Sequence, residues 1–574
     1  MERDVHTLYN EWRRNAVEDP DVARELAAIE GKEDEIFDRF YQSLTFGTAG
    51  LRGVIGAGTN RMNIYTVNQA TQGLADFLNS TYEEPSVAIA YDSRIKSEDF
   101  ARSAAGVLAA NGIKVHIYKE LMPTPMLSFA VRELECQSGI IITASHNPSQ
   151  YNGYKCYDPE GYQMTDESAA KTYDFISKVD LFTGVRRMSF EEGLEKGLIE
   201  YIDDDVIEEF YSRVLTCQIT PGVCSKADLS VIYTPLNGTG NKPVREILRR
   251  IGQTNVRVVP QQELPDGKFP TCPYPNPEIK QVFECGIEMS REEPADLLLA
   301  TDPDCDRVGI AVKDHGEYHL MSGNEVGAML LDYILKNRTE KGSLPVNPVA
   351  VKSIVTSDLI DRIAEHYHCE VRHLLTGFKY IGEFITQLEK TDEDDRFIFG
   401  MEESYGYLCG THARDKDAVV ASMLICEMAA YYKLQGKTLV QVMNELYDRH
   451  GMYLSRLLNF AFEGAAGMEK MQGIMELLRR EHPEEIAGRR IVFSADYDSG
   501  VCTDYRTGSH SGTNLPRSNV LSYKLEDRSG VIVRPSGTEP KIKVYITAVA
   551  PDRAQAEAVA DALERDIKAK MNIE

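Results

Sequence analysis

The sequence lacks the features that mark membrane, secreted and zinc-stabilised proteins. It contains no run of about 18 apolar residues, the length that a membrane-spanning helix requires. Its first residues, Met1 to Asp4, do not start an apolar signal core. The 11 cysteines are scattered without a CxxC pair, which argues against a disulfide framework and a structural zinc site. These absences predict reduced thiols, no membrane contact and a cytoplasmic location.

Positive charge is also in short supply. Lys and Arg together number 63 against 89 Asp and Glu, and the formal net charge is −26. A chain with this balance repels nucleic acids and anionic membranes, so we expect neither as a partner. An anionic small-molecule substrate would need a local basic cleft. The composition therefore predicts that any such cleft is assembled from a few well-placed cations.

Apolar residues are plentiful enough for several cores. They make up 43% of the 574 residues, and a chain of this length fits roughly three to five domains. Residues 1–45 are charged and helical in pattern, so we predict an N-terminal helical extension. Its candidate buried positions are Leu8, Trp12, Leu26, Ile29, Ile36, Phe37 and Phe40.

From residue 46 onward, short apolar runs alternate with helical patterns, which is typical of βαβ layers. We predict an α/β fold: three tandem α/β modules with mixed, largely parallel sheets at residues 46–208, 209–321 and 322–450. Residues 451–574 form a smaller α+β domain. In the first module, Ser97 is predicted to cap a helix. Strands are expected at residues 86–91, 113–118, 138–142, 229–233, 256–259, 297–300, 349–355, 396–399, 531–533 and 543–546.

The segment Thr143-Ala-Ser-His-Asn-Pro148 directly follows the apolar run at residues 138–142. Ligand sites of α/β sheets lie at the carboxyl ends of strands, so Ser145 is placed where a substrate would bind. Pro148 cannot continue a strand ladder and moves Asn147 out of the helical region, which fixes the turn. The alternative is a plain turn that ends a strand.

A second polar segment, Asp302-Pro-Asp304-Cys-Asp306-Arg307, follows the apolar run at residues 297–300. Three carboxylates at alternate positions can converge on one hard cation, and oxygen ligands suit Mg²⁺. An EF-hand is excluded because its glycine and glutamate positions are occupied by Arg307 and Lys313. A solvated acidic turn is the remaining alternative.

A nucleophilic hydroxyl, a carboxylate-bound Mg²⁺ and nearby cations together indicate phosphoryl transfer through a phosphoserine. His146 and Lys155 could neutralise charge or move protons, although either could equally be structural. The glycine-rich segment at residues 46–53 contains Arg52 and suggests a backbone that approaches an anion closely. A structural turn explains that segment as well.

Two further segments are candidates for substrate recognition. Residues 400–406 include Glu402 and Ser404, whose carboxylate and hydroxyl suit sugar hydroxyls; a surface turn is the alternative. The segment that starts at Arg534 gathers a guanidinium, two hydroxyls and a glycine turn, a combination that fits a phosphate. A simple hairpin is the alternative for this second segment.

The motifs T-A-S-H-N-P with Y-N-G-Y-K, D-P-D-C-D-R, E-E-S-Y-G and R-P-S-G-T-E-P occur in this order. Together they resemble the α-D-phosphohexomutase superfamily, in its phosphoglucomutase/phosphopentomutase branch, from about residue 46 to the C-terminus. The resemblance implies four domains around a central cleft, each contributing one loop.

By position, Ser145 resembles the family's phosphoserine, and its phosphate would be a further Mg²⁺ ligand. The resemblance assigns the protein ligands of Mg²⁺ to Asp302, Asp304 and Asp306. It assigns sugar hydroxyls to Glu402 and Ser404, and the distal phosphate to Arg534, Ser536, Gly537 and Thr538. Less decisive matches, as cleft cations and proton carriers, are Arg52, His146, Lys155, Arg307, Lys379 and Lys416.

Two positions depart from relatives of this superfamily. Phosphomannomutase and phosphoglucosamine mutase relatives often carry a histidine after the sugar loop, where this chain has Tyr405-Gly-Tyr407. That histidine is therefore absent as a general acid or base, and the Glu-Glu-Ser form resembles glucose-preferring members. Cys305 occupies a position usually held by a small residue, and we expect its side chain to pack away from the metal.

The resemblance implies an enzyme that interconverts glucose 1-phosphate and glucose 6-phosphate. Phospho-Ser145 and Mg²⁺ would act with glucose 1,6-bisphosphate as intermediate, and small-molecule sugar phosphates would be its partners. The alternatives are a phosphopentomutase acting on ribose 1-phosphate or deoxyribose 1-phosphate, and a catalytically silent sugar-phosphate binding protein. We expect a monomer or a homodimer.

Overall fold

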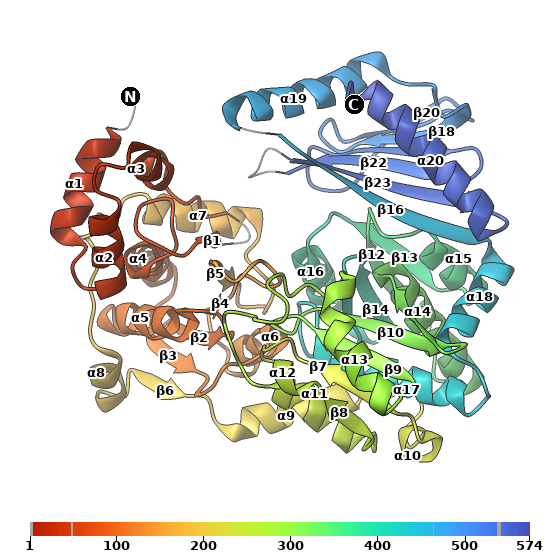
Figure 1. Cartoon of the computed structure of the whole chain (residues 1–574), viewed down its shortest axis with the longest axis horizontal. Coiled ribbons are helices and arrows are strands. Elements are labelled where there is room, and N and C mark those ends of the chain that lie inside the picture. Colours follow the sequence, from red (N-terminus) through yellow and green to blue (C-terminus); the bar gives the residue numbers. More distant parts are fainter. Residues whose placement is uncertain (1–3, 48–49, 463, 537–540, 574) are drawn as a thin grey trace.

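The computed structural model describes residues 4–47, 50–462, 464–536 and 541–573. Four α/β or α+β units and an N-terminal group of helices follow one another along the chain (Figure 1). The C-terminal unit lies above the third one, and its helix α19 (Gly464–Glu481) projects toward the first (Figure 1). None of the described helices is long and apolar enough to cross a membrane.

Three short helices precede the first sheet, as the sequence predicts. Asp4 and Asp19 cap the first two through side-chain hydrogen bonds to the backbone of the first turn. Most of the expected positions are buried or half-buried, but Phe37 is 59% exposed, so its assignment to the core is wrong. Phe37 stacks on Tyr41 at the surface instead. The helices are α1 (Val5–Asn15), α2 (Pro20–Ala28) and α3 (Glu33–Phe40).

Domain I contains a six-stranded sheet in the order β1-β5-β4-β2-β3-β6. The central pairs β2–β3 and β2–β4 are parallel, whereas β5 is antiparallel to both β4 and β1. The strands are β1 (Leu51–Val54), β2 (Ser86–Tyr91), β3 (Lys114–Ile117), β4 (Ser138–Ile142), β5 (Tyr151–Tyr157) and β6 (Ile199–Tyr201). The helices are α4 (Ile64–Thr81), α5 (Ser97–Ala110), α6 (Thr124–Glu133), α7 (Asp166–Ile176) and α8 (Phe190–Glu195).

The predicted cap of α5 is wrong. Lys96, not Ser97, precedes the helix, and it makes no side-chain capping hydrogen bond. Ser97 donates its hydroxyl to Asp92 Oδ1 at 2.7 Å instead. The serine therefore supports the loop before the helix rather than the first turn.

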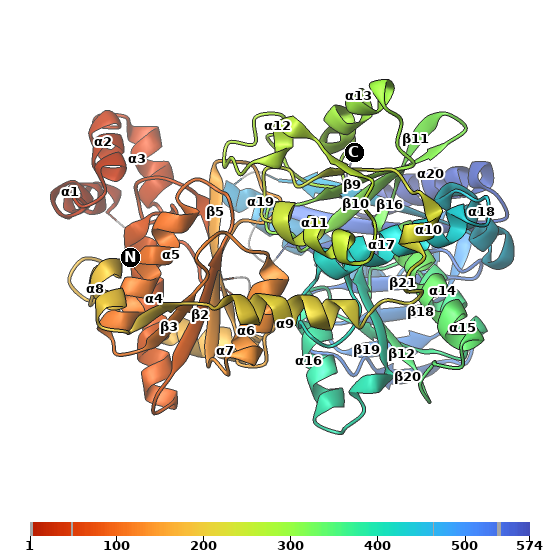
Figure 2. The ribbon, with the colours of Figure 1, turned by 90° about the horizontal axis from the view of Figure 1, so that it is seen from below.

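Domain II has a five-stranded sheet in the order β11-β10-β9-β7-β8, and helix α9 links it to domain I (Figure 2). The strands are β7 (Val231–Thr234), β8 (Val256–Val258), β9 (Leu297–Thr301), β10 (Val308–Asp314) and β11 (Glu317–Met321). The helices are α9 (Asp204–Leu215), α10 (Cys224–Ala227), α11 (Asn241–Arg250), α12 (Pro260–Glu263), η1 (Lys280–Phe283) and α13 (Glu284–Glu292).

Domain III has a four-stranded sheet in the order β13-β12-β14-β15, parallel except for its last pair. The strands are β12 (Val349–Ser353), β13 (Glu370–Leu374), β14 (Phe397–Glu402) and β15 (Gly406–Leu408). The helices are α14 (Gly323–Glu340), α15 (Leu359–His366), α16 (Phe378–Glu389), η2 (Asp394–Arg396), α17 (Ala418–Lys433) and α18 (Leu439–His450). Strand β14 reaches Glu402, three residues beyond the predicted end at Phe399.

Domain IV is built on an antiparallel sheet in the order β16-β23-β22-β21-β18-β19-β20, with β17 paired to β18. Helices α19 and α20 (Arg553–Lys570) complete this α+β unit. The strands are β16 (Met452–Ala461), β17 (Glu485–Ile486), β18 (Arg489–Asp496), β19 (Val501–Asp504), β20 (Ser509–Gly512), β21 (Leu521–Leu525), β22 (Gly530–Pro535) and β23 (Lys541–Ala550).

The hydrophobic cores show which units are packed together. One continuous core joins residues of domains I, II and III, including Phe129, Phe210, Tyr233 and Met401. Domain IV has its own core around Leu563 between its sheet and helices. The first three domains therefore share buried apolar surface, whereas most of the fourth folds around its own.

Candidate active site

Ser145 lies just past the end of β4, in the left-handed backbone conformation with φ of 52°. Few non-glycine residues adopt this conformation, and such strain is often found at functional sites. Thr143 Oγ1 accepts the backbone N–H of Ser145 at 2.8 Å. The turn presents Ser145 Oγ to two groups: it donates to Asp302 Oδ2 at 2.9 Å and lies 3.2 Å from His146 Nδ1.

Arg94 binds the backbone of this turn. Sequence patterns did not indicate a functional role for it. Its buried guanidinium donates to the carbonyl oxygens of Ser145, Asn147, Pro148 and Tyr151. One cation thus fixes four peptide groups of the loop. Guanidinium has five donors in a rigid fork, so lysine could not replace it here.

The carboxylates of Asp302, Asp304 and Asp306 converge, with one ligand atom from each lying within 4.8 Å of the others. All three residues are buried. Asp304 Oδ1 and Asp306 Oδ1 have no hydrogen-bond partner among the described residues. Burial of an unpaired carboxylate oxygen is costly, so these two atoms fit a cation that binds between them. Cys305 is fully buried in the apolar core, as expected.

Domain I contributes a cation and a helix end to this cluster. Lys155 Nζ on β5 donates to Asp304 Oδ2 at 3.0 Å, and Thr124 at the start of α6 donates to the same oxygen. Burial and repulsion by the neighbouring carboxylates raise the pKa of Asp302 well above its usual value. Burial opposes ionisation of Asp304 too, but Lys155 holds its pKa below the usual value.

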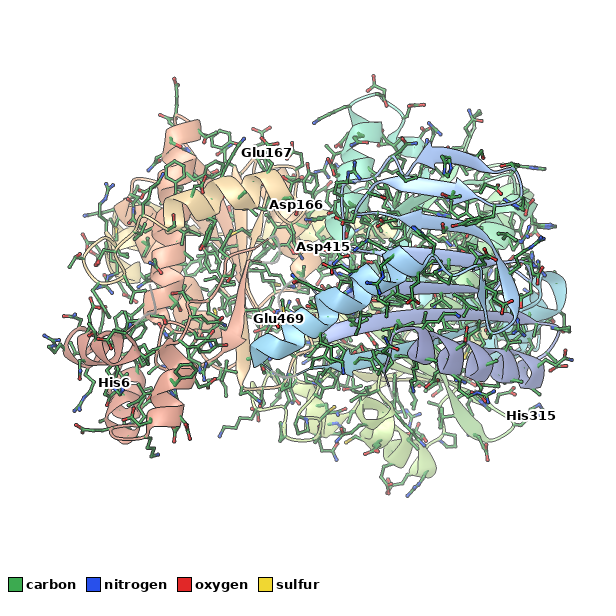
Figure 3. The ribbon with its side chains drawn as sticks, turned by 90° about the horizontal axis from the view of Figure 1, so that it is seen from above. His6, Asp166, Glu167, His315, Asp415 and Glu469 are labelled. Atoms are coloured by element: carbon green, nitrogen blue, oxygen red, sulfur yellow. The ribbon has the colours of Figure 1, made fainter. Side chains whose placement is uncertain are left out.

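Domain III contributes a second cation. Lys416 Nζ lies 3.1 Å from Asp306 Oδ2 and 3.0 Å from Asp415 Oδ1. Burial alone would lower the pKa of Lys416, but Asp306 and Asp415 raise it, so the amine stays charged. Its side chain passes close over Gly406, where a Cβ atom would collide with it. In Figure 3, Asp415 lies in the middle of the molecule, far from His6 and His315 at its ends.

His146 is the candidate proton carrier next to Ser145. Burial lowers the pKa of His146 well below its usual value, and the positive charges of Arg307 and Arg52 act in the same direction. The imidazole is therefore neutral at physiological pH and can accept a proton. Arg52 is on β1, where it lies opposite Gly153, and Thr143 N at the start of the Ser145 turn donates to Gly153 O.

The sugar-loop candidates lie at the carboxyl end of β14 and directly after it. Glu402 accepts the backbone N–H of Gly377 at 2.6 Å, and the backbone oxygen of Ser404 accepts from Arg307 Nη1 at 2.8 Å. Arg307 therefore ties the carboxylate cluster of domain II to the sugar loop of domain III. Burial and the charge of Glu402 raise the pKa of the adjacent Glu403 to about 7.

Lys379, at the start of α16, lies 2.8 Å from Asp166 Oδ1 on α7. This ion pair connects domain III to domain I, and Asp166 is placed between these two parts of the molecule in Figure 3. Lys379 is thus not directed at the carboxylate cluster in this conformation. It is positioned instead where the two domains face each other.

Domain IV carries the phosphate-loop candidates. Arg534 is the second-last residue of β22, and its register partner on β23 is Lys543. Limited hydration and the charge of Arg534 lower the pKa of Lys543, which shows that the two cations are close. The backbone N–H of Ser536 donates to Lys541 O. Gly537 and Thr538 lie outside the described residues.

The site thus brings together Ser145, His146, Lys155, the three aspartates, Arg307 and Lys416. Arg94 and Lys543 were missed by sequence reasoning. Lys543 had a usable signal, because it alternates with buried residues on a strand directly after the phosphate motif. Arg94 had none beyond its place in a loop at a strand end.

Family models match this chain over most of its length. The four phosphoglucomutase/phosphomannomutase domains match in order: α/β/α domain I at residues 43–182, II at 208–316, III at 322–450, and the C-terminal domain at 458–565. The chain therefore belongs to the phosphoglucomutase/phosphomannomutase family, within the α-D-phosphohexomutase superfamily.

Curated relatives give the same result at the level of whole chains. The phosphoglucomutase of Staphylococcus epidermidis is 37% identical over 508 residues, which cover 88% of this chain and 90% of the relative. That of Staphylococcus saprophyticus is 36% identical, with 90% and 92% covered. These lengths show that the likeness extends over most of both proteins.

Solved structures show the same fold. Parafusin (pp63, a phosphoglucomutase) from Paramecium, in its open form, has a TM-score of 0.67 at 18% identity and covers 92% of this chain and 95% of its own. A phosphoglucomutase/phosphomannomutase family protein from Burkholderia thailandensis has a TM-score of 0.65 at 17% identity, with 92% and 97% covered. At these identities, the comparison concerns the fold alone.

Proposed function

We propose that this protein is a phosphosugar mutase that interconverts glucose 1-phosphate and glucose 6-phosphate through a phosphoserine at Ser145. The observation that carries the proposal is the contact of Ser145 Oγ with Asp302, beside a buried carboxylate cluster flanked by Lys155 and Lys416. The phosphoglucomutase relatives at 36–37% identity support glucose as the sugar.

In the first half-reaction, the bond between Ser145 Oγ and phosphorus breaks, and a bond forms from phosphorus to the free hydroxyl oxygen of the sugar phosphate. The hydroxyl proton moves to a base, for which neutral His146 is one candidate. The product is glucose 1,6-bisphosphate. After this intermediate turns over, its other phosphoryl group returns to Ser145 and the proton is given back, so that atoms and charge balance.

Each remaining residue has a proposed role in this reaction. Lys155 and Lys416 offset negative charge, and Arg52 neutralises charge beside the Ser145 turn. Mg²⁺ held by the three aspartates would polarise the transferring phosphoryl group. Sugar hydroxyls would bind Glu402 and Ser404, with Arg307 and Lys379 as neighbouring cations. The phosphate that is not reacting would bind Arg534, Lys543, Ser536, Gly537 and Thr538.

Two further proposals concern the chain as a whole. We propose the domain boundaries 46–208, 209–321, 322–450 and 451–574, which agree with each sheet lying inside one range. We also propose a cytoplasmic enzyme, which the eleven free cysteines support. The charge balance supports neither nucleic acid nor a membrane as a partner, and the phosphoglucomutase relatives support sugar phosphates.

The test is turnover on purified protein with Mg²⁺ and a trace of glucose 1,6-bisphosphate, comparing glucose 1-phosphate, mannose 1-phosphate and ribose 1-phosphate. We expect kcat/KM to be highest for glucose 1-phosphate, and intact-protein mass to show a phosphorylated fraction. A higher kcat/KM for ribose 1-phosphate would indicate a phosphopentomutase. No turnover with any substrate and no phosphoserine would indicate a binding protein.

A further inference from the structure

The three N-terminal helices precede the part of the chain that matches the family, which begins at residue 43. They are nevertheless packed firmly on domain I, at the left of Figure 1. Trp12 makes edge-to-face contacts with Tyr65 of α4 at 5.5 Å and with Phe182 at 5.6 Å. We name residues 4–41 the N-terminal module.

Polar contacts of the module converge on the segment between β1 and α4. Glu25 Oε2 accepts the backbone N–H of Ala57 at 2.5 Å, and Arg39 Nη1 donates to Ala57 O at 3.3 Å. Glu25 and Arg39 also pair with each other at 2.8 Å. One ion pair thus binds both the donor and the acceptor of a single residue in domain I.

The sequence of this segment is adapted to the contact. Gly56 and Gly58 both have positive φ, of 153° and 123°. A Cβ atom at Gly56 would lie 2.9 Å from Glu25 Oε2, and one at Gly58 would lie 2.6 Å from Arg39 O. Side chains at either position would push the segment away from the ion pair.

The segment continues β1, and β1 carries Arg52. This strand is at the edge of the domain I sheet, paired only with β5 among the strands of the described chain. Arg52 lies opposite Gly153, two residues before Lys155. An edge strand is held by hydrogen bonds on one side only, so its position depends on what fixes its ends. At its carboxyl-terminal end, Val54 O accepts from Met62 N within domain I, and the module adds the contacts to Ala57 three residues further on.

A second contact reaches the loop that contains Arg94. Lys96 Nζ lies 2.9 Å from Asp21 Oδ2 and 3.6 Å from Asp19 Oδ2, both at the start of α2. Lys96 is two residues beyond Arg94 and has φ of 66°. The module is therefore connected both to the loop of the buried Arg94 and to the strand of the exposed Arg52.

We propose that the N-terminal module is a brace for the reaction centre, and that Glu25 is a positioning residue which acts through Arg52. By fixing Ala57, the Glu25–Arg39 pair holds β1 in register, so that the guanidinium of Arg52 faces the Ser145 turn. This inference rests on the proposed function, because Arg52 is assigned to phosphoryl transfer there.

The experiment measures single-turnover transfer of the phosphoryl group from phospho-Ser145 to glucose 1-phosphate, in the full-length protein with Mg²⁺. Glu25→Ala should slow transfer by about tenfold, as loss of a charge-assisted hydrogen bond typically does. Glu25→Gln keeps an acceptor for Ala57 N–H and should retain most of the rate. Glu30→Ala is the matched control, because Glu30 pairs with Arg13 in the same module at 2.6 Å without contacting residues 55–61.

The decisive comparison repeats Glu25→Ala in an Arg52→Ala background. Because Glu25 acts through Arg52, adding Glu25→Ala to this background should slow transfer by less than about twofold. Such a reduced effect is the signature of coupling in a double-mutant cycle. The brace would be overturned if Glu25→Ala slowed transfer equally in the parent and in the Arg52→Ala background. Transfer at the parental rate in Glu25→Ala would also overturn it. Equal losses in Glu30→Ala and Glu25→Ala would overturn it as well.

Detachment of the module can be detected directly, because Trp12 is the only tryptophan of the chain. In Glu25→Ala, a shifted Trp12 emission supports the brace if transfer is slowed and this slowing is absent in the Arg52→Ala background. A shifted emission with transfer at the parental rate overturns it. Failure of the underlying function has a different result. If Arg52→Ala alone transfers at the parental rate, the role of Arg52 is wrong.

Discussion

The half of the site formed by domains I to III differs from the half carried by domain IV in the packing that supports it. In the first half, Ser145, Asp302, Lys155 and Lys416 are buried and contact one another across three domains. A continuous hydrophobic core supports them. These proposed catalytic groups are therefore held in place by contacts within the protein itself.

Domain IV meets domain III through apolar contacts and ion pairs. Tyr453 and Val549 of domain IV join the large core. A smaller cluster contains Ile354, Val355 and Leu375 of domain III, and Val520, Ile532 and Tyr545 of domain IV. The ion pairs Lys524–Asp358 and Arg553–Glu325 also connect the two domains. Domain IV thus contributes few residues to the large core and has a core of its own. From this difference we expect domain IV to move as a unit while the carboxylate cluster stays fixed.

Ser145→Ala is the sharpest way to break the rigid half. Because Ser145 Oγ would carry the transferred phosphoryl group, mutase activity should fall by about a thousandfold or more. Steady-state turnover and intact-protein mass measure it. Ser80→Ala, at the exposed end of α4, is the control and should keep parental activity. Parental turnover in Ser145→Ala would show that another group carries the phosphoryl.

Asp304→Asn tests whether the cluster holds a cation. Loss of one ligand charge should weaken Mg²⁺ binding and turnover together, by on the order of 100-fold. In chelator the variant should also melt at a lower temperature than the parent, because the buried Lys155, which holds the pKa of Asp304 below its usual value, would lose its charged partner. Isothermal titration with Mg²⁺ and thermal melting with and without chelator distinguish the two effects. Parental Mg²⁺ affinity would contradict the ligand assignment.

Arg534→Ala tests the movable half. Loss of a charge-assisted phosphate contact should raise KM by about 10- to 100-fold. It should also release more glucose 1,6-bisphosphate per turnover, because domain IV no longer holds the intermediate. Phosphorylation of Ser145 and Mg²⁺ binding should be preserved. Arg490→Ala, an exposed arginine on the same sheet, is the control and should change neither quantity. An unchanged KM and release in Arg534→Ala would make this segment a plain hairpin.

Glu403→Gln gives the smallest effect and tests the boundary between the halves. Glu403 accepts from Ser353 at 3.1 Å, and burial raises its pKa in the folded protein from 4.5 to about 7. The folded state therefore binds a proton more tightly than the unfolded one, so parental stability falls as the pH rises from 4.5 to 7.

The expected gain of Glu403→Gln over the parent is thus about 1–2 kcal/mol at pH 8 and near zero at pH 4.5, after allowance for partial solvent screening. Thermal melting across this pH range measures it. Glu340→Gln, exposed on α14, is the control. A difference between Glu403→Gln and the parent that does not vary with pH would place the raised pKa elsewhere.

Sequence patterns predicted the elements that depend on local apolar periodicity. The strands at residues 86–91 and 138–142 occur with the predicted bounds, because both are continuous apolar runs ended by polar turns. The end of β14 was wrong by three residues, since Gly400 and Glu402 give no apolar signal although the strand is buried. The prediction that Phe37 is buried was wrong, because helical spacing alone does not reveal which face of a short helix packs against a neighbour.

The sequence by itself determined the chemistry: a serine after β4, three alternating aspartates after β9 and an arginine at the end of β22, each at a strand end. Only the tertiary structure decided which groups surround them. Arg94 reaches the Ser145 loop, and Glu25 reaches Ala57, through contacts between residues 51 and 32 positions apart in the chain. Such contacts depend on packing of separate elements, and a local pattern carries no information about which distant group will be its neighbour.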